Sequence, residues 1–185
     1  MDRDEALNLL KTHVKNENMI KHCLASEAVL RALAAELNED QDKWGLAGLL
    51  HDLDVEITDA DLSIHTRETE NILREHGIDE EIIEAVKLHN LEAHPGEDRT
   101  KPLHYALAAG ETVTGLIIAT TLVYPDKKLA SVKTKSVVKR MKEKAFARSV
   151  NRDTIRECEK LDIDLNRFVE ISINAMRNIS DDLGL

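Results

Sequence analysis

Residues that break helices are scarce in this chain, and this restricts its fold more than any other feature. Its 185 residues include only seven Gly and three Pro, while Ala, Leu, Glu and Lys are abundant. Few residues are therefore left for the tight turns that join β-strands, and the common residues have high helix propensity. Apolar residues also recur at helical spacing along almost the whole sequence. An all-α fold is predicted, and an all-β fold is rejected.

The limits of the helices can be predicted from capping residues. Asp40 and Asp79 are suited to helix N-caps, and Gly77 to a C-terminal stop. Pro102 suits a first helical turn, and Pro125 is expected to end a long apolar helix. The pattern predicts nine helices, at residues 4–15, 18–38, 41–53, 66–76, 79–91, 102–123, 129–148, 153–160 and 165–182.

The length fits one domain spanning residues 1–185, large enough to bury a core. Its central region is expected at 18–123, with the helices of 129–185 packing on it. Segments 54–65 and 91–101 are irregular and polar, so they are predicted to be loops. The apolar side chains of the last helix could cover this core or form a dimer interface: Phe168, Ile171, Ile173, Met176 and Ile179.

The cysteines and the N-terminus favour a cytoplasmic protein. Cys23 and Cys158 are isolated, which argues against a disulfide framework and for a reducing compartment. The first residues, Met-Asp-Arg-Asp-Glu, lack the order of a signal peptide. The long uncharged stretch from Pro102 to Pro125 contains His104, Glu111 and several Thr, so a buried helix is expected instead of a membrane span.

Charge is unevenly distributed along the sequence. The formal net charge is −10, yet residues 127–148 contain nine Lys or Arg and one Glu, a local charge of +8. The remaining residues therefore carry 16 − 34 = −18. This basic segment could be an ordinary solvated helix face or a rim that attracts a phosphorylated ligand. Its single aromatic residue, Phe146, argues against nucleic acid as the main partner.

Several histidines and acidic residues fall on apolar helix faces. His22 aligns with apolar residues of its helix at helical spacing, and His51 and Asp52 end a mostly apolar run that contains two glycines. His65 and His89 also align with apolar neighbours. A single inward His is usually a hydrogen-bonded core residue, but so many on different helices favour a joint role.

Glu111 lies in the most apolar helix, where it is the only charged residue between Lys101 and Asp126. An isolated buried carboxylate is costly, so a metal ion, a basic side chain or a raised pKa must compensate. Imidazole and carboxylate ligands without a thiolate favour iron or manganese, with nickel, cobalt, zinc or magnesium as alternatives. The sequence therefore predicts a site for one or two divalent metal ions. The alternative is a polar network without metal.

The order of these residues resembles the HD-domain superfamily of metal-dependent phosphohydrolases. The sequence around the His51-Asp52 pair and the segment Thr114-Gly115-Leu116-Ile117 are also similar to small stand-alone HD proteins. The resemblance extends over essentially the whole chain and implies an HD-type helical bundle. It further implies that a metal-bound water hydrolyses a phosphate ester, such as a nucleotide, without a nucleophilic Ser or Cys.

The resemblance assigns six metal ligands and, among them, two catalytic residues, His51 and Asp52. His22, His51 and Asp52 match the ligands of a first metal, and His65 and His89 match those of a second, which Asp52 would bridge. Glu111 stands where the family has Asp. Asn90 stands where some members with two metals have a further His, which implies weaker binding of the second ion.

Further residues are expected near the substrate. His104 lies two helical turns before Glu111 and is a candidate to orient a ligand or contact phosphate. His94 is a candidate loop contact, and Lys135, Lys139 and Lys142 could neutralise phosphate charge. His76 is expected to interact with a helix C-terminus, and His13 has no assigned role.

These predictions leave three functions open. The first is hydrolysis of a nucleotide or another small phosphate ester. The second is a regulatory domain that binds metal and a phosphorylated ligand with weak turnover. The third is a diiron oxygenase, since some HD-domain proteins use similar ligands with iron.

Overall fold

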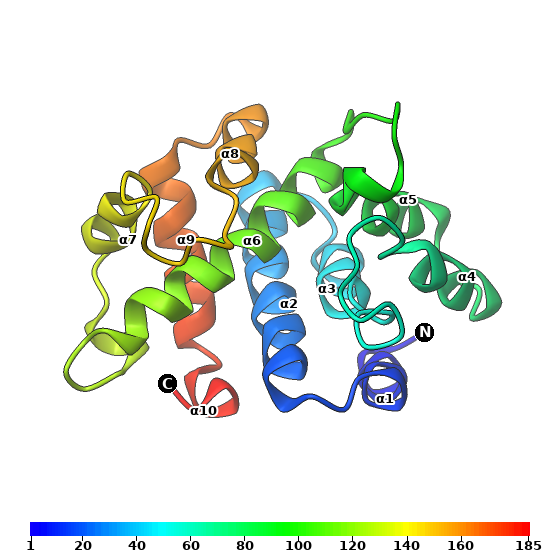
Figure 1. Cartoon of the computed structure of the whole chain (residues 1–185), viewed down its shortest axis with the longest axis horizontal. Coiled ribbons are helices and arrows are strands. Elements are labelled where there is room, and N and C mark those ends of the chain that lie inside the picture. The colour runs from blue at the N-terminus through cyan, green and yellow to red at the C-terminus, as the bar shows by residue number, and fades with distance from the viewer.

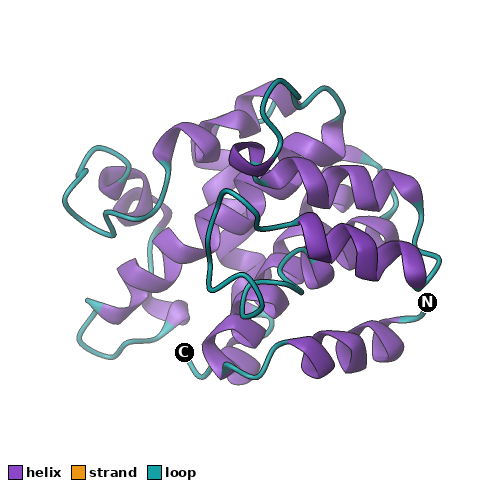
Figure 2. Cartoon of the chain, turned by 45° about the vertical axis from the view of Figure 1, so that its right-hand side comes forward, coloured by secondary structure: helices purple, strands orange, loops and turns teal.

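The computed structural model describes residues 1–185 and contains helices but no strand (Figures 1 and 2), so the predicted all-α class is confirmed. The helices are α1 (Arg3–His13), α2 (Glu17–Leu37), α3 (Gln41–Leu50), α4 (Arg67–Glu75), α5 (Glu80–His89), α6 (Pro102–Leu122), α7 (Thr134–Arg140), α8 (Arg152–Ile155), α9 (Leu165–Arg177) and α10 (Ser180–Leu183). Three short 3-10 helices join them: η1 (Leu91–Ala93), η2 (Leu129–Ser131) and η3 (Arg156–Leu161).

The two longest helices, α2 and α6, lie at the centre of the molecule (Figure 1). Helix α2 packs against α3, α6 and α9, and α6 packs against α5, α8 and η3. A connected apolar core of 43 buried residues runs from Ala6 to Leu183. Phe168 and Met176 of α9 are fully buried in it, so this face of the last long helix covers the core.

Capping residues set the helix ends largely as predicted. The Asp40 carboxylate accepts the backbone N–H groups of Asp42 and Lys43, and Asp79 accepts that of Glu81. Gly77 follows α4 with a φ of 65°, a backbone conformation that glycine adopts without strain. Pro102 is the first residue of α6, which ends at Leu122, shortly before Pro125.

Gly48 allows α3 to approach α2 closely. A Cβ atom at this position would lie 2.7 Å from the carbonyl oxygen of Ser26 on α2. Any larger residue would therefore separate the two helices. This close approach brings the end of α3 toward His22.

The predicted helix 153–160 is divided between α8 and the 3-10 helix η3, and two further predicted helices are wrong in extent. Residues 129–148 form η2 and the seven-residue α7, followed by turns up to Val150. The guanidinium of Arg152 donates hydrogen bonds to the carbonyls of Phe146, Ala147 and Val150, which stabilises these turns in place of a helix. The predicted helix 165–182 divides into α9 and α10, separated by Asn178 and Ile179.

Helix α6 is long and apolar enough to cross a membrane by length and composition alone. However, 61% of its most apolar stretch is buried inside the protein, as in the core helix of a folded domain. It is therefore weak support for a membrane span. Cys23 and Cys158 are both buried and unpaired.

Candidate metal centre

Four helices and one loop bring the six predicted ligands together. His22 lies on α2, His51 caps the end of α3, and Asp52 follows it. The remaining ligands are His65 at the end of the 51–66 loop, His89 as the last residue of α5, and Glu111 on α6. Residues distant in sequence thus converge because α3 and α6 pack against α2, and α5 packs against α3 and α6.

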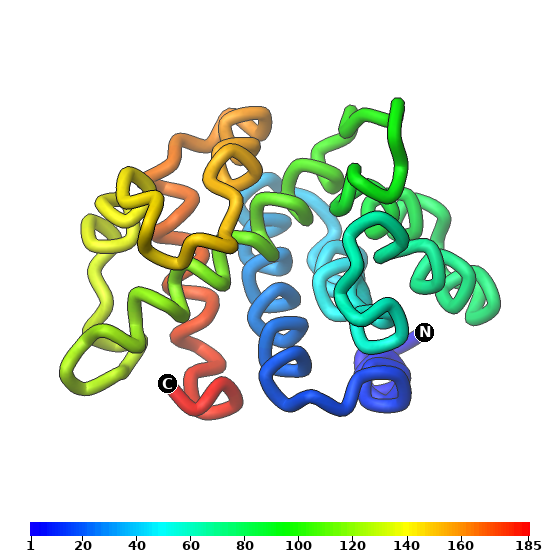
Figure 3. The backbone as a smooth tube through the Cα atoms, viewed as in Figure 1, coloured from blue at the N-terminus to red at the C-terminus, as the bar shows by residue number.

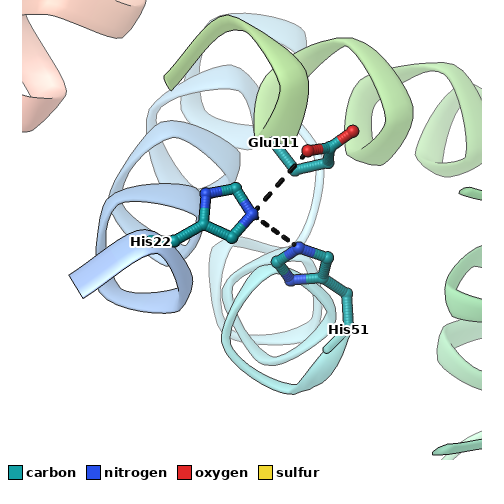
Figure 4. Close-up of side chains that lie close together, drawn as sticks. All are labelled: His22, His51 and Glu111. Carbon is teal, nitrogen blue, oxygen red and sulfur yellow. Dashed lines mark hydrogen bonds and ion pairs between the residues drawn. The ribbon is translucent and has the colours of Figure 1, made fainter. Parts of the chain in front are cut away.

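One set of ligand atoms lies around His22 (Figure 4). Its Nε2 atom is 3.1 Å from Nε2 of His51 and 3.7 Å from a carboxylate oxygen of Glu111. The Oδ2 atom of Asp52 is 3.6 Å from Nε2 of His22 and 3.4 Å from Nε2 of His51. Three side chains and one oxygen of Asp52 therefore face a common point.

A second set lies on the other side of Asp52. Its Oδ1 atom is 3.1 Å from Nε2 of His65 and 3.6 Å from Nε2 of His89. The two imidazoles are themselves 3.3 Å apart, Nε2 to Nε2. Asp52 thus directs one carboxylate oxygen to each set, which is the arrangement that a carboxylate bridging two ions requires.

The Nδ1 atoms of His22, His51 and His89, which point away from the cluster, already have hydrogen-bond partners. Nδ1 of His51 donates to the carbonyl of Gly48 at 2.9 Å, and Nδ1 of His89 donates to that of Val86 at 2.6 Å. Nδ1 of His22 is 3.1 Å from the Thr114 hydroxyl, which uses its own proton to bond the Glu111 carbonyl. Each neutral ring therefore has its proton on Nδ1 and a free lone pair on Nε2.

Asp54 orients the fourth histidine, and its role was missed in the sequence. This fully buried carboxylate lies 2.7 Å from Nδ1 of His65 and also accepts the backbone N–H groups of Thr66, Glu68 and Thr69. The available signal was the His-Asp-Leu-Asp sequence, in which a second acidic residue follows the His-Asp pair in a buried segment.

The arrangement fits a metal ion better than a hydrogen-bonded network. The Nε2 lone pairs of His22 and His51 face each other at 3.1 Å, and burial lowers the pKa of both rings, so these lone pairs repel unless a metal cation lies between them. The inward-facing donors are nitrogens and oxygens, a set typical of iron, manganese or zinc. The four histidines, Asp52 and Glu111 are therefore suitable ligands for divalent metal ions.

The pKa values describe the same cluster without its cation. Burial raises the pKa of the Glu111 carboxyl to about 8 and lowers that of the His51 imidazole to about 3. Burial also lowers the pKa of His65, but hydrogen bonds to Asp52 and Asp54 outweigh this effect and raise it to about 10. Burial opposes ionisation of Asp52, yet the adjacent His51 and His65 keep its pKa well below the usual value.

Cys23 lies beside the cluster, which was not expected from the sequence. Its sulfur is close enough to ligand atoms of His51 and Asp52 to form a three-residue group with them. Burial and the nearby Asp52 raise the pKa of its thiol well above the usual value. Cys23 is therefore a neutral thiol and a poor ligand, since metals bind the thiolate.

The additional histidines occupy different positions. His94 reaches the surroundings of the cluster, because its Nε2 is 2.8 Å from the hydroxyl of Thr66, the residue after His65. His104 does not: its Nδ1 accepts the backbone N–H groups of Thr100 and Lys101, so it caps α6. The role predicted for His104 therefore receives no support. His76 bonds the carbonyl of Ile72 at the end of α4, as predicted.

Asn90 stabilises the loop before His65 and has no contact with the ligand atoms. Its side-chain amide donates to the carbonyls of Leu62 at 2.7 Å and His65 at 3.0 Å, and its oxygen accepts the N–H of Glu92. With its donors and its oxygen occupied, Asn90 adds no ligand to the His65 and His89 set.

A cavity of about 300 Å³ leads to the cluster, and His22, His89 and Glu111 line it. Lys135, Lys139 and Lys142 do not line this cavity, although they were predicted substrate contacts. Lys139 lines a different cavity, with Tyr124 of the segment after α6. The structure therefore does not place these lysines at the candidate site, because the helix predicted for 129–148 ends at Arg140.

The sequence was compared with known proteins. The family model described as HD domain matches residues 19–119, a segment that includes all six candidate ligands. No curated protein matches the chain.

Proposed function

Since the chain belongs to the HD domain family, whose members are generally metal-dependent phosphohydrolases, we propose that it hydrolyses a small phosphate ester. The observation that supports this most strongly is the position of Asp52 between two sets of ligand atoms. A carboxylate with one oxygen on each side is suited to two neighbouring ions.

In this proposal, His22, His51, Asp52 and Glu111 hold one ion, and Asp52, His65 and His89 hold the other. Iron or manganese is preferred for these nitrogen and oxygen ligands, with nickel, cobalt, zinc and magnesium as alternatives. When bound, such ions lower the pKa of a water molecule toward neutrality and polarise phosphoryl oxygens.

The residues of the chain fix the positions of these ligands. Gly48 and Val86 hold His51 and His89 through their carbonyls, and Asp54 holds His65 through its carboxylate. Glu111, with a pKa near 8, can carry a proton near neutral pH and lose it when a cation binds. Cys23 is protonated and buried, so it does not act as a nucleophile.

The test is phosphate release from a panel of phosphomonoesters, cyclic nucleotides and dinucleotides, with protein purified without chelator and supplied with Mn²⁺ or Fe²⁺. We expect metal-dependent turnover in the wild type and in Asp98→Ala, which removes an exposed carboxylate of the 91–101 loop. Asp52→Ala should lose this turnover by at least a hundredfold. Equal release by the wild type and Asp52→Ala would exclude hydrolysis at this site.

Asn90 favours a second candidate function, a regulatory domain that binds a phosphorylated ligand with weak turnover. Because its amide is committed to the loop carbonyls, the second ion would have only Asp52, His65 and His89 as protein ligands. Tight binding of a phosphorylated ligand, measured by calorimetry in the absence of conversion, would support this function over hydrolysis.

A further inference from the structure

The cavity above the cluster has no basic side chain in its wall. Its floor consists of His22, His89 and Glu111, all of them candidate ligands. Its remaining lining residues are neutral. Apart from bound metal ions, the cavity therefore offers no positive charge to a substrate.

The polar part of the wall carries hydroxyl and amide groups. Thr112 lies on α6 beside Glu111, while Ser149, Asn151 and Thr154 come from the segment at the start of α8. The Asn151 oxygen accepts the N–H groups of Asp153 and Thr154, which fixes this segment. The Thr112 hydroxyl already donates to the Ala108 carbonyl. The groups left to bond the hydroxyls of a ligand are the side-chain nitrogen of Asn151 and the hydroxyls of Ser149 and Thr154.

The other part of the wall is apolar and close to the same groups. Leu62 contributes a half-exposed side chain from the loop before His65, and Val150 faces Gly115 of α6. Figure 3 shows the segment from α7 to α8 returning toward α6. Two of its residues, Ser149 and Val150, line the cavity. A small carbon skeleton can contact this apolar wall while its hydroxyls face the polar one.

Basic side chains near the cavity either have partners or lie outside its lining. Arg148, which precedes Ser149, is exposed to solvent and does not line the cavity. Arg99 donates to the carbonyls of Leu88 and His89 and pairs with Glu157 at 2.6 Å. Arg140 pairs with Glu143 and lines a separate cavity. A second anionic group on a substrate would therefore lose hydration without gaining a basic partner, at a cost in binding free energy.

We infer that the substrate is a phosphomonoester whose remainder is small, uncharged and hydroxyl-bearing, such as a polyol or sugar phosphate. This inference rests on the proposed function, which places the phosphoryl group at the metal ligands. The cavity is at the lower end of the size range of ligand pockets, which favours a small molecule. Substrates with a further carboxylate or phosphate are disfavoured.

Three matched esters test this inference with the metal-loaded protein. Glycerol 3-phosphate carries hydroxyls, 3-phosphoglycerate replaces one hydroxymethyl group with a carboxylate, and propyl phosphate lacks hydroxyls. We expect kcat/KM for glycerol 3-phosphate to be at least about tenfold higher than for 3-phosphoglycerate. It should also be severalfold higher than kcat/KM for propyl phosphate.

Substitutions in the cavity wall test which residues cause the preference for glycerol 3-phosphate. The double change Ser149→Ala with Thr154→Val should lower kcat/KM for glycerol 3-phosphate severalfold and reduce its advantage over propyl phosphate. Ser149→Lys should favour 3-phosphoglycerate by about tenfold relative to the wild type. Ser136→Ala, which removes a serine of the separate cavity lined by Lys139, is the matched control and should preserve all three ratios.

The outcomes separate the inference from the proposed function. Metal-dependent turnover that needs Asp52 but is equal or faster with 3-phosphoglycerate would overturn the inference and leave hydrolysis intact. Unchanged ratios in the Ser149 variants would also overturn it. Turnover of all esters at the level of Asp52→Ala would overturn both.

Discussion

One buried carboxylate, that of Asp54, determines how His65 faces the candidate centre. Oδ1 of Asp54 accepts a hydrogen bond from Nδ1 of His65, and Oδ2 accepts backbone N–H groups at the start of α4. The same residue therefore positions a ligand and caps a helix. This role depends on where the chain turns after Asp52, so residue spacing alone did not indicate it.

Asp54→Asn tests this role. A neutral amide has one acceptor oxygen, so it cannot satisfy both His65 and the N–H groups of α4. We expect the affinity for the second metal ion to fall about 10- to 100-fold, with a smaller change for the first. Titration calorimetry with Mn²⁺ would resolve the two ions. Equal losses at both, or none, would contradict the role, and Asp98→Asn is the control.

Glu111 should make the stability of the metal-free protein depend on pH. Burial raises its pKa from an ordinary value of 4.5 to about 8. Between these values the unfolded chain releases this proton and the native protein retains it, so stability falls as pH rises from about 4.5 to 8. Glu111→Gln removes this contribution.

The measurement is urea unfolding of chelator-treated wild type and Glu111→Gln at pH 5 and pH 8. Relative to the variant, the wild type should lose stability at the higher pH. An identical pH dependence of both proteins would show that the Glu111 carboxyl titrates normally. The comparison removes the contributions of other titrating groups that both proteins share.

At the scale of helices, the ligands of the first set meet because α2 and α3 touch. Gly48 lies on α3 opposite the backbone of Ser26 and Glu27, without room for a side chain. His51 follows one turn later and directs its ring toward His22. The close contact between α2 and α3 at Gly48 therefore helps to position His51 beside His22.

Gly48→Ala should be strongly destabilising. The added Cβ would lie 2.7 Å from a backbone oxygen, and the two helices would have to separate. We expect a loss of roughly 2 kcal/mol or more in the free energy of unfolding, despite the better helix propensity of Ala. Gly115→Ala, whose Cβ would meet only a side-chain atom at 3.4 Å, should change stability by less than about 1 kcal/mol. Similar losses in both variants would refute the argument.

The helices that carry the ligands could be predicted because their apolar residues follow a helical period and their caps are local signals. The segment 129–148 could not, because the turns at its end depend on Arg152, which lies beyond it and bonds the carbonyls of Phe146, Ala147 and Val150. Like charges four residues apart, such as Lys144 and Arg148, also disfavour a continuous helix here. The position of Ser149 and Asn151 in the cavity wall therefore could not be predicted from the sequence.

For the whole molecule, the candidate centre connects parts of the chain that are far apart. Its ligands come from α2, the end of α3, the loop before α4, α5 and α6, and the wall of its cavity includes Ser149, Val150, Asn151 and Thr154. Arg99 and Glu157 join the loop after α5 to η3 beside this cavity. A cation bound by these ligands would therefore link most of the fold.

Metal binding should accordingly raise the thermal stability. An ion that binds only the native state, present at about 100 times its Kd, stabilises by about 2.7 kcal/mol. For a domain of this size, that corresponds to a rise in Tm of roughly 5–10 °C. Scanning calorimetry with and without Mn²⁺ measures this shift. Asp52→Ala should show a much smaller shift, and an equal one would place the bound ion elsewhere.

We propose that six side chains form a centre for two metal ions bridged by Asp52. Mass-spectrometric metal analysis of protein purified without chelator, and again after reconstitution with Fe²⁺ or Mn²⁺, tests it most directly. We expect the wild type to approach about two equivalents and Asp52→Ala to retain less than half of that content. Less than about a tenth of an equivalent in reconstituted wild type would contradict the claim.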